Sequence, residues 1–125
     1  MSTTCTSTVS PDGKYIIQKI VGEIDAKIAL DLNRETHALG HRLGINRYLT
    51  DVTEARNTDT PLDNYDFAYK DMPDNPGIDR SARVALLVDP EDYSHDFVET
   101  VCRNAGLDVT LFRDRDVDVR HLLGE

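Results

Sequence analysis

The amino-acid sequence predicts an α/β fold: a mixed sheet of about five strands with an N-terminal hairpin and helices packed on the sheet. Near the N-terminus, two short β-prone segments flank a strong turn sequence, which predicts the hairpin. Further along, strand-like apolar runs alternate with segments of helical periodicity, a pattern typical of parallel strands joined by helices. The chain has 125 residues, and single domains commonly contain about 100–150. We therefore expect one domain spanning residues 1–125.

The hairpin is predicted from the turn sequence Pro11-Asp12-Gly13. Proline and aspartate favour the early positions of a β-turn, and glycine tolerates the positive φ that such turns often need. Residues 6–10 form the first predicted strand. Residues 15–21 form the second, which is rich in β-branched and aromatic side chains and ends at Gly22. We expect this pair to supply an antiparallel edge of the sheet.

A first helix is predicted between Asp25, a favourable N-cap residue, and Gly44, which suits the position after a helix. At about 100° per residue, five side chains fall on one line, which should contact the sheet. These are Ile28, Leu32, Thr36, Leu39 and Leu43. His37 and His41 lie about 140° and 180° from that line, so we expect both imidazoles to be in solvent.

The middle of the chain predicts a strand over residues 47–52, a loop over residues 53–59 and a second helix. Thr60-Pro61 marks the start of this helix, because threonine caps helices and proline suits the first turn. One face of the second helix combines four residues spaced by three and four: Leu62, Tyr65, Tyr69 and Met72. Pro73 ends it.

The last third predicts two more strands and two more helices. Residues 83–88 form a continuous apolar run, which is typical of a buried parallel strand. A third helix begins at Asp92 or Ser94 and ends before Gly106. Residues 109–112 form the last predicted strand, and Asp116 opens a short final helix.

Composition excludes several classes of function. The chain has 23 Asp and Glu against 14 Lys and Arg, a formal net charge of -9. Nucleic acids and anionic membranes attract basic surfaces, so we expect neither as a partner. The longest apolar run, residues 84–88, is far shorter than the roughly 20 residues of a membrane span. The first residues lack the features of a secretory signal, so we expect a cytoplasmic protein whose two cysteines, Cys5 and Cys102, are reduced.

Four segments carry a resemblance to a known family. They are Gly22-Glu23-Ile24-Asp25, Tyr48-Leu49-Thr50-Asp51-Val52-Thr53-Glu54-Ala55, Ala82-Arg83-Val84-Ala85-Leu86-Leu87 and Gly106-Leu107-Asp108-Val109-Thr110-Leu111-Phe112-Arg113. With the order of elements, they resemble the STAS fold of anti-sigma-factor antagonists, and more closely the single-domain SpoIIAA-like or STAS/SEC14-like branch. The resemblance implies a STAS-like domain with a binding or regulatory role.

The same resemblance implies where a phosphorylation site would lie. In the antagonists, a phosphorylatable serine follows the third strand, within an Asp-Ser-x-Gly-like segment. The matching residues 51–61 contain neither serine nor glycine, which leaves Thr58 and Thr60 as candidate acceptors. Asp59 and Asp63 flank the predicted helix start and would repel a phosphate. The alternative is that Thr60 only caps the helix.

Charged residues after the third and later strands suggest a ligand site at one edge of the sheet, where open α/β sheets bind ligands. Asp51, Glu54 and Arg56 are candidates for its rim, because a guanidinium binds phosphate or carboxylate through a fork of donors. The alternative for Glu54 and Arg56 is a surface ion pair. Asp51, Asp89 and Asp114 could hold magnesium, or could act only as turn formers and helix caps.

Catalytic signatures are absent from the sequence. His37 and His41 have a metal-ligand spacing, but the glutamate of a zinc-protease motif does not follow His37. Ser94-His95-Asp96 contains the residue types of a triad, but neighbours along a helix do not face one another. We therefore expect no metal, no cofactor and no enzymatic activity.

The second predicted helix is aromatic on more than one face, since Phe67 points away from Tyr65, Tyr69 and Met72. Large apolar groups on both faces suggest that this helix contacts something besides its own sheet. Our first interpretation is that this helix forms a homodimer interface. The protein would then be a non-enzymatic cytosolic binding or regulatory module with an unknown protein partner. The alternative is a lipid or small apolar ligand in a slot beside this helix, as the SEC14 resemblance implies.

Overall fold

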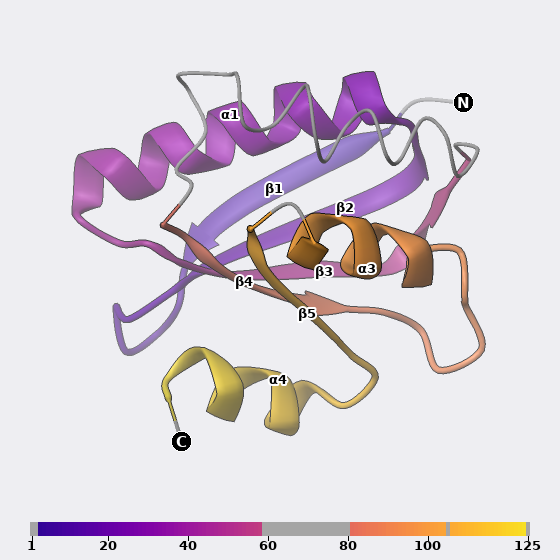
Figure 1. Ribbon diagram of the computed structural model, residues 1–125. Coiled ribbons are helices and arrows are strands. Elements are labelled where there is room, and N and C mark those ends of the chain that lie inside the picture. The colour runs from indigo at the N-terminus through magenta and orange to yellow at the C-terminus, as the bar shows by residue number, and fades with distance from the viewer. Residues whose placement is uncertain (1–2, 59–80, 105, 125) are drawn as a thin grey trace.

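The computed structural model describes residues 3–58, 81–104 and 106–124. Five strands form one mixed sheet in the order β1-β2-β3-β4-β5 (Figure 1). β1 (Thr4–Val9) runs antiparallel to β2 (Ile16–Ile24). The parallel part continues through β3 (Arg47–Asn57), β4 (Arg83–Leu87) and β5 (Asp108–Phe112). The predicted fold class, a mixed sheet of about five strands opened by a hairpin, is confirmed.

The hairpin turn forms where the sequence places it, and Gly13 has the positive φ of +72° that the turn needs. The buried Ser10 hydroxyl organises it, because it accepts hydrogen bonds from the backbone N–H groups of Lys14 and Tyr15. Both strands begin or end differently from the prediction. β1 starts at Thr4 rather than residue 6, and β2 continues through Gly22 to Ile24, because β3 remains paired with it up to Ile24.

Helix α1 (Ala26–Leu43) has the predicted ends. The Asp25 side chain accepts a hydrogen bond from Ile28 N at 2.8 Å, and Gly44 closes the helix with φ +72°. The buried face differs from the prediction at its C-terminal end. Leu43 is 48% exposed, whereas His37 is buried and stacks on Tyr48 with ring centroids 4.7 Å apart. The expectation that His37 faces solvent is wrong, because the Tyr48 ring provides an aromatic surface against this side of the helix.

The helices cover the two faces of the sheet. On one face, Ala29 and Leu32 of α1 pack on a core of Ile20, Val52 and Leu86. On the other face, α4 (Arg115–Leu122) packs its Leu122 against Leu49, Ala85 and Leu87. α3 (Asp96–Asn104) lies beside β5 (Figure 1).

β3 is longer than the sequence predicts. It pairs with β4 only as far as Asp51 opposite Leu87, but it stays paired with β2 up to Asn57. A register shift between Lys19 and Val21 marks a bulge in this pairing. Glu54 and Arg56, which the sequence assigned to a loop, are therefore strand residues. The segment contains no glycine or proline, and the extended β2 gives it a partner.

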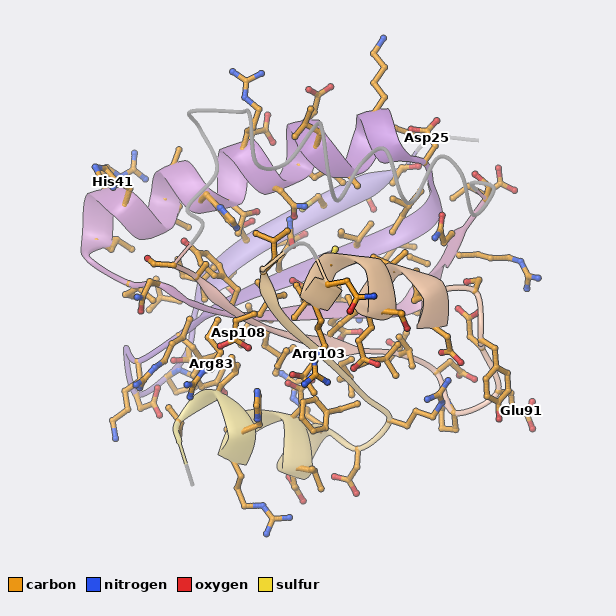
Figure 2. All side chains as sticks on the ribbon, in the orientation of Figure 1. Asp25, His41, Arg83, Glu91, Arg103 and Asp108 are labelled. Carbon is orange, nitrogen blue, oxygen red and sulfur yellow. The ribbon has the colours of Figure 1, made fainter. Side chains whose placement is uncertain are left out.

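The C-terminal elements differ from the prediction mainly at their starts. Arg83 and Asp108 form an ion pair between β4 and β5, with Nε and Oδ2 3.3 Å apart (Figure 2). α3 begins at Asp96, after the two predicted caps. α4 begins at Arg115, because the Asp114 side chain takes the cap position and accepts from the backbone N–H groups of Asp116 and Val117. Within the described residues, no helix is long and apolar enough to cross a membrane.

The second helix predicted from Thr60-Pro61 lies outside the described residues.

Candidate functional site

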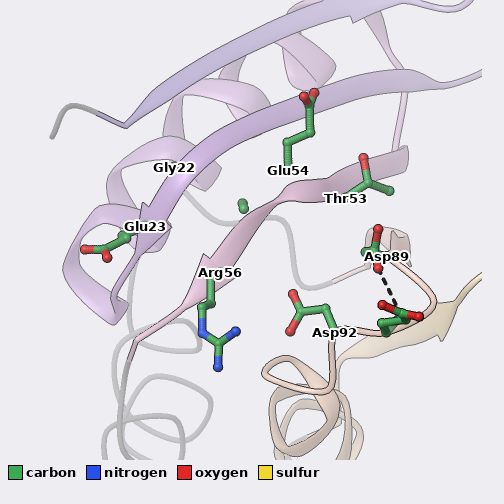
Figure 3. Close-up of a pocket in the computed structure, with 9 residues that line it drawn as sticks. Gly22, Glu23, Thr53, Glu54, Arg56, Asp89 and Asp92 are labelled. Carbon is green, nitrogen blue, oxygen red and sulfur yellow. Dashed lines mark hydrogen bonds between the residues drawn. The ribbon is translucent and has the colours of Figure 1, made fainter.

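A pocket of about 500 Å³ lies at the carboxyl edge of the parallel strands, between β3 and the loop that follows β4 (Figure 3). It exists because β3 runs past the end of β4, so the second half of β3 faces a loop instead of a strand. The lining comes from three segments: Gly22 and Glu23 of β2, residues 53–56 of β3, and Asp89, Glu91 and Asp92 of the loop.

Two aspartates shape the loop after β4. The Asp89 carboxylate accepts a hydrogen bond from Glu91 N, and the Asp92 carboxylate accepts one from Ser94 N, each at 2.9 Å. A backbone bond from Asp92 N to the Asp89 carbonyl closes the turn between them. Both residues therefore form turns in the way short carboxylate side chains usually do.

Side chains of this loop fasten it to the open edge of β3. The Ser94 hydroxyl accepts a hydrogen bond from Asn57 N at 3.1 Å. His95, buried at 4% exposure, places Nε2 3.3 Å from the Ala55 carbonyl oxygen and 3.5 Å from the Asp92 carboxylate. Since only an N–H can donate to a carbonyl, we assign the proton to Nε2. The two side chains replace strand pairing that β4 no longer provides.

Burial affects both members of the Asp92–His95 pair. Desolvation holds the pKa of His95 below its ordinary value, so the imidazole is neutral at pH 7. Desolvation alone would raise the pKa of Asp92. The hydrogen bonds from Ser94 and the positive charge of Arg56 outweigh it, and the pKa of that carboxyl is lowered. Asp92 is therefore an anion beside a neutral imidazole.

The pocket is strongly acidic. Among the described residues, Glu23, Glu54, Asp89, Glu91 and Asp92 line it, against one cationic lining residue, Arg56. Glu54 is partly neutralised by Lys19, whose Nζ lies 2.9 Å from its carboxylate. In Figure 3, Arg56 and Asp92 lie on the two facing sides of the opening. This arrangement suits a charged polar partner better than an apolar one.

The three predicted rim residues are divided between two places. Glu54 and Arg56 line the pocket. Asp51 is buried instead; its carboxylate accepts from Thr53 N and from the Thr53 hydroxyl, and lies 3.9 Å from the guanidinium of Arg115 in α4.

The aspartates proposed for magnesium do not come together. Asp89 shapes the loop, Asp114 caps α4, and Asp51 lies under α4. Across the described part of the chain, no three His, Cys, Asp or Glu side chains form a group that could hold a metal ion.

Of the candidate phospho-acceptors, Thr58 is exposed and follows the last residue of β3. Its backbone N–H and its hydroxyl both donate to the Ile24 carbonyl, at 2.9 and 3.2 Å. The other candidate residues lie outside the described residues: Thr60, Tyr65, Phe67, Tyr69 and Met72.

Sequence reasoning missed the contribution of the loop after β4. Ser94, His95 and Asp96 do not act together, because each has a different partner: Asn57, Ala55 and Arg113. The strand order could have predicted this contribution, because the carboxyl ends of the parallel strands β3 and β4 lie at the same edge of the sheet.

Asp118 was also missed. It is a fully buried aspartate on α4, and neither carboxylate oxygen has a hydrogen-bond partner. Burial raises its pKa to about 7; the charge of Asp51 adds to the rise and Arg115 opposes it. No local signal marks such a residue, since its helix presents acidic side chains throughout its first turn.

Comparison with known proteins places the fold. No protein-family model matches the sequence, and a search of curated proteins finds no match. An anti-sigma factor antagonist from Mycobacterium paratuberculosis is similar in structure, with a TM-score of 0.62 at 9% identity over 98% of this chain and 95% of that one. An uncharacterized protein with a SpoIIAA-like fold from Shewanella loihica gives 0.54 at 15% identity, over 96% and 93%. The protein therefore has the SpoIIAA-like STAS fold.

Proposed function

We propose that this protein is a non-enzymatic regulatory module that binds a partner protein at the pocket between β3 and the loop after β4. The observation that carries the proposal is the pocket itself, an open charged concavity at the carboxyl edge of the sheet. This edge is where proteins with open α/β sheets bind their ligands. It also adjoins Thr58, in the segment where the STAS resemblance implies the regulated residue.

The fold neighbours support a protein partner. The similar structure from Mycobacterium paratuberculosis is described as an anti-sigma factor antagonist, a name that implies action on another protein. We transfer only the general role, a regulatory module that acts by binding.

The chemistry of the pocket supports binding rather than catalysis. Its one histidine neighbour, His95, is buried, neutral and engaged with the Ala55 carbonyl. The carboxylates of Asp89 and Asp92 accept backbone hydrogen bonds within their own loop. The charged lining also favours a polar partner over the lipid or small apolar ligand of the alternative reading.

Photo-crosslinking in the source cells tests the proposal. A photoreactive amino acid replaces Arg56 or Glu91 at the pocket, and Lys27 of α1 or Arg120 of α4 as exposed controls. We expect one discrete protein to be captured from both pocket positions and from neither control. Equal capture from all four positions, or none from any, would contradict a partner site here.

A binding measurement with the captured protein then tests the charges. Arg56→Glu should weaken affinity at least tenfold, because it replaces a guanidinium that binds a carboxylate or phosphate of the partner with a carboxylate that repels it. The matched control is Arg103→Glu on the exposed surface of α3, with the same change of charge. Mass spectrometry of the same purified protein also reports whether Thr58 carries phosphate.

A further inference from the structure

β1 forms one edge of the sheet, and among the described residues no strand pairs with its outer side. Its only strand neighbour among the described residues is β2. The hydrogen bond from Ser10 N to the Tyr15 carbonyl shows which residues of β1 bond to β2: counting back from Ser10 in steps of two, these are Thr8, Thr6 and Thr4. In an antiparallel pair, alternate residues bond to the neighbour and the residues between them point away. The backbone N–H and C=O groups of Cys5, Ser7 and Val9 therefore point outward.

This edge lacks the devices that usually protect an open strand. Natural edge strands carry charged side chains, proline or bulges that block pairing with another chain. β1 has six residues, Thr-Cys-Thr-Ser-Thr-Val, none of them charged and none proline or glycine. It pairs with β2 residue by residue from Thr4 to Val9 without a register shift. In a chain that is 30% charged, this uncharged strand is distinctive.

The opposite edge of the sheet provides the contrast. β5 carries Asp108, which is paired with Arg83. Its outward Leu111 N–H donates to the Glu99 carboxylate of α3. A helix side chain thus occupies the β5 edge, whereas no side chain of the described residues bonds to the outward backbone groups of β1.

A hydrogen-bond network also ties β1 to its neighbours, through the buried side chains of Thr36, Gln18 and Thr50. The Ser7 and Thr36 hydroxyls are hydrogen-bonded at 2.9 Å, which fastens β1 to α1. Gln18 donates to Thr36 at 2.9 Å and accepts from Thr50 at 3.0 Å, which extends the network into β3. A pre-ordered edge loses little conformational entropy when it pairs.

We propose that β1 pairs antiparallel with β1 of a second copy, which joins two five-stranded sheets into one. A two-fold axis brings a strand against itself in antiparallel orientation, so the same backbone groups match on both sides. An uncharged strand allows this approach even though each chain carries a formal net charge of -9. No residue of β1 lines the pocket, so the proposal does not rest on the partner site.

The register follows from the outward residues. Pairing centred on Ser7 places Ser7 opposite itself and Cys5 opposite Val9 of the partner subunit. This register uses the outward backbone groups of all three residues in both copies. It also places Thr6 opposite Thr8 of the partner subunit, a favourable cross-strand pair.

The mass of the intact chain in solution tests the proposal, by sedimentation over a range of concentrations. We expect a species of twice the 14.1 kDa chain mass. Thr6→Glu with Thr8→Glu places carboxylates opposite each other in the proposed register, so the dissociation constant of the dimer should rise at least tenfold. The matched control is Val117→Glu of α4 with Thr100→Glu of α3, which adds the same charge at exposed positions outside β1 and β2; it should dimerise like the wild type.

A charge swap separates lost pairing from lost folding. The Thr6→Lys, Thr8→Lys variant should be monomeric alone but should form a heterodimer when mixed with the Glu variant. A wild type that stays monomeric at all concentrations would overturn the proposal. So would a Glu variant that dimerises like its control, a mixture without heterodimer, or masses that grow beyond the dimer.

Discussion

Gly40 of α1 lies directly against Tyr48 of β3, with no space for a side chain. A Cβ atom on Gly40 would lie 2.6 Å from the Ile45 carbonyl oxygen and 2.8 Å from Cζ of Tyr48. Tyr48 is itself buried and stacked on His37, so it has little freedom to move away. The close approach of helix and strand therefore depends on a glycine inside the helix.

Gly40→Ala should lower the free energy of unfolding by about 1–3 kcal/mol, the usual cost of overpacking. The sign is informative, because alanine inside a helix otherwise stabilises it by about 1 kcal/mol relative to glycine. Urea denaturation measures the difference. Adding Tyr48→Phe removes the hydroxyl nearest to the new methyl group and should recover part of the loss. A Gly40→Ala variant as stable as the wild type would show that the two elements can separate freely.

The ends of α1 were predictable from the sequence. Which side chains of its C-terminal half are buried was not predictable. Asp25 and Gly44 act through bonds to backbone groups within one turn, so local sequence identifies them. The burial of His37 depends on Tyr48, a residue of another element. Helical periodicity within α1 cannot identify Tyr48 as the residue that buries His37, because Tyr48 belongs to the next strand.

The same distinction explains the site. Sequence spacing located Glu54 and Arg56 near the carboxyl edge of the sheet, because strand order alone brings them there. The length of β3 depends on how far β2 and β4 run beside it. The loop after β4 became part of the pocket for the same reason, since the end of β4 determines where the open edge of β3 begins.

Asp118 should make the protein less stable as the pH rises. Its pKa is raised from 3.8 to about 7 in the folded protein, first through burial. Between these values the folded state binds more protons than the unfolded state, so the free energy of unfolding falls with rising pH and levels off above about pH 7. Asp118→Asn should remove this slope and be more stable at pH 8, by on the order of 2 kcal/mol. Denaturation at several pH values measures the effect.

The control for Asp118 is Asp116→Asn, which removes a carboxylate from an exposed position on the same helix. This variant should keep the slope of the wild type. If Asp118→Asn and Asp116→Asn follow the same profile, the buried carboxylate is not the group that titrates.

His95 should contribute a slope of the opposite sign. Burial lowers its pKa from 6.5, so the unfolded state binds more protons below that pH. The stability that the neutral imidazole provides is present above about pH 6.5 and is lost as the pH falls. His95→Gln keeps a donor near the Ala55 carbonyl but cannot titrate, so its stability should fall less between pH 6.5 and 5.

The pH ranges in which Asp118 and His95 change the free energy of unfolding overlap. Because the two changes have opposite signs, they partly cancel in the wild type. The double variant, Asp118→Asn with His95→Gln, separates them and should show the flattest profile between pH 4 and 7. A wild-type profile that neither single variant changes would contradict both assignments.

The two cysteines should differ sharply in reactivity. Cys102 is 3% exposed, and burial raises its pKa to about 12. Because the thiolate is the reactive form, Cys102 should react with a disulfide reagent at pH 8 only when the protein unfolds. Cys5 is half-buried on β1 and its pKa is raised by burial to a lesser degree, so it should react first and without unfolding. Thiol titration of Cys5→Ser and Cys102→Ala assigns the fast and slow phases of the reaction to the two cysteines. Cys5→Ser should keep only the slow phase. The rate of that phase should rise with urea in step with unfolding. A slow phase that urea leaves unchanged would mean that reagent reaches Cys102 in the folded core.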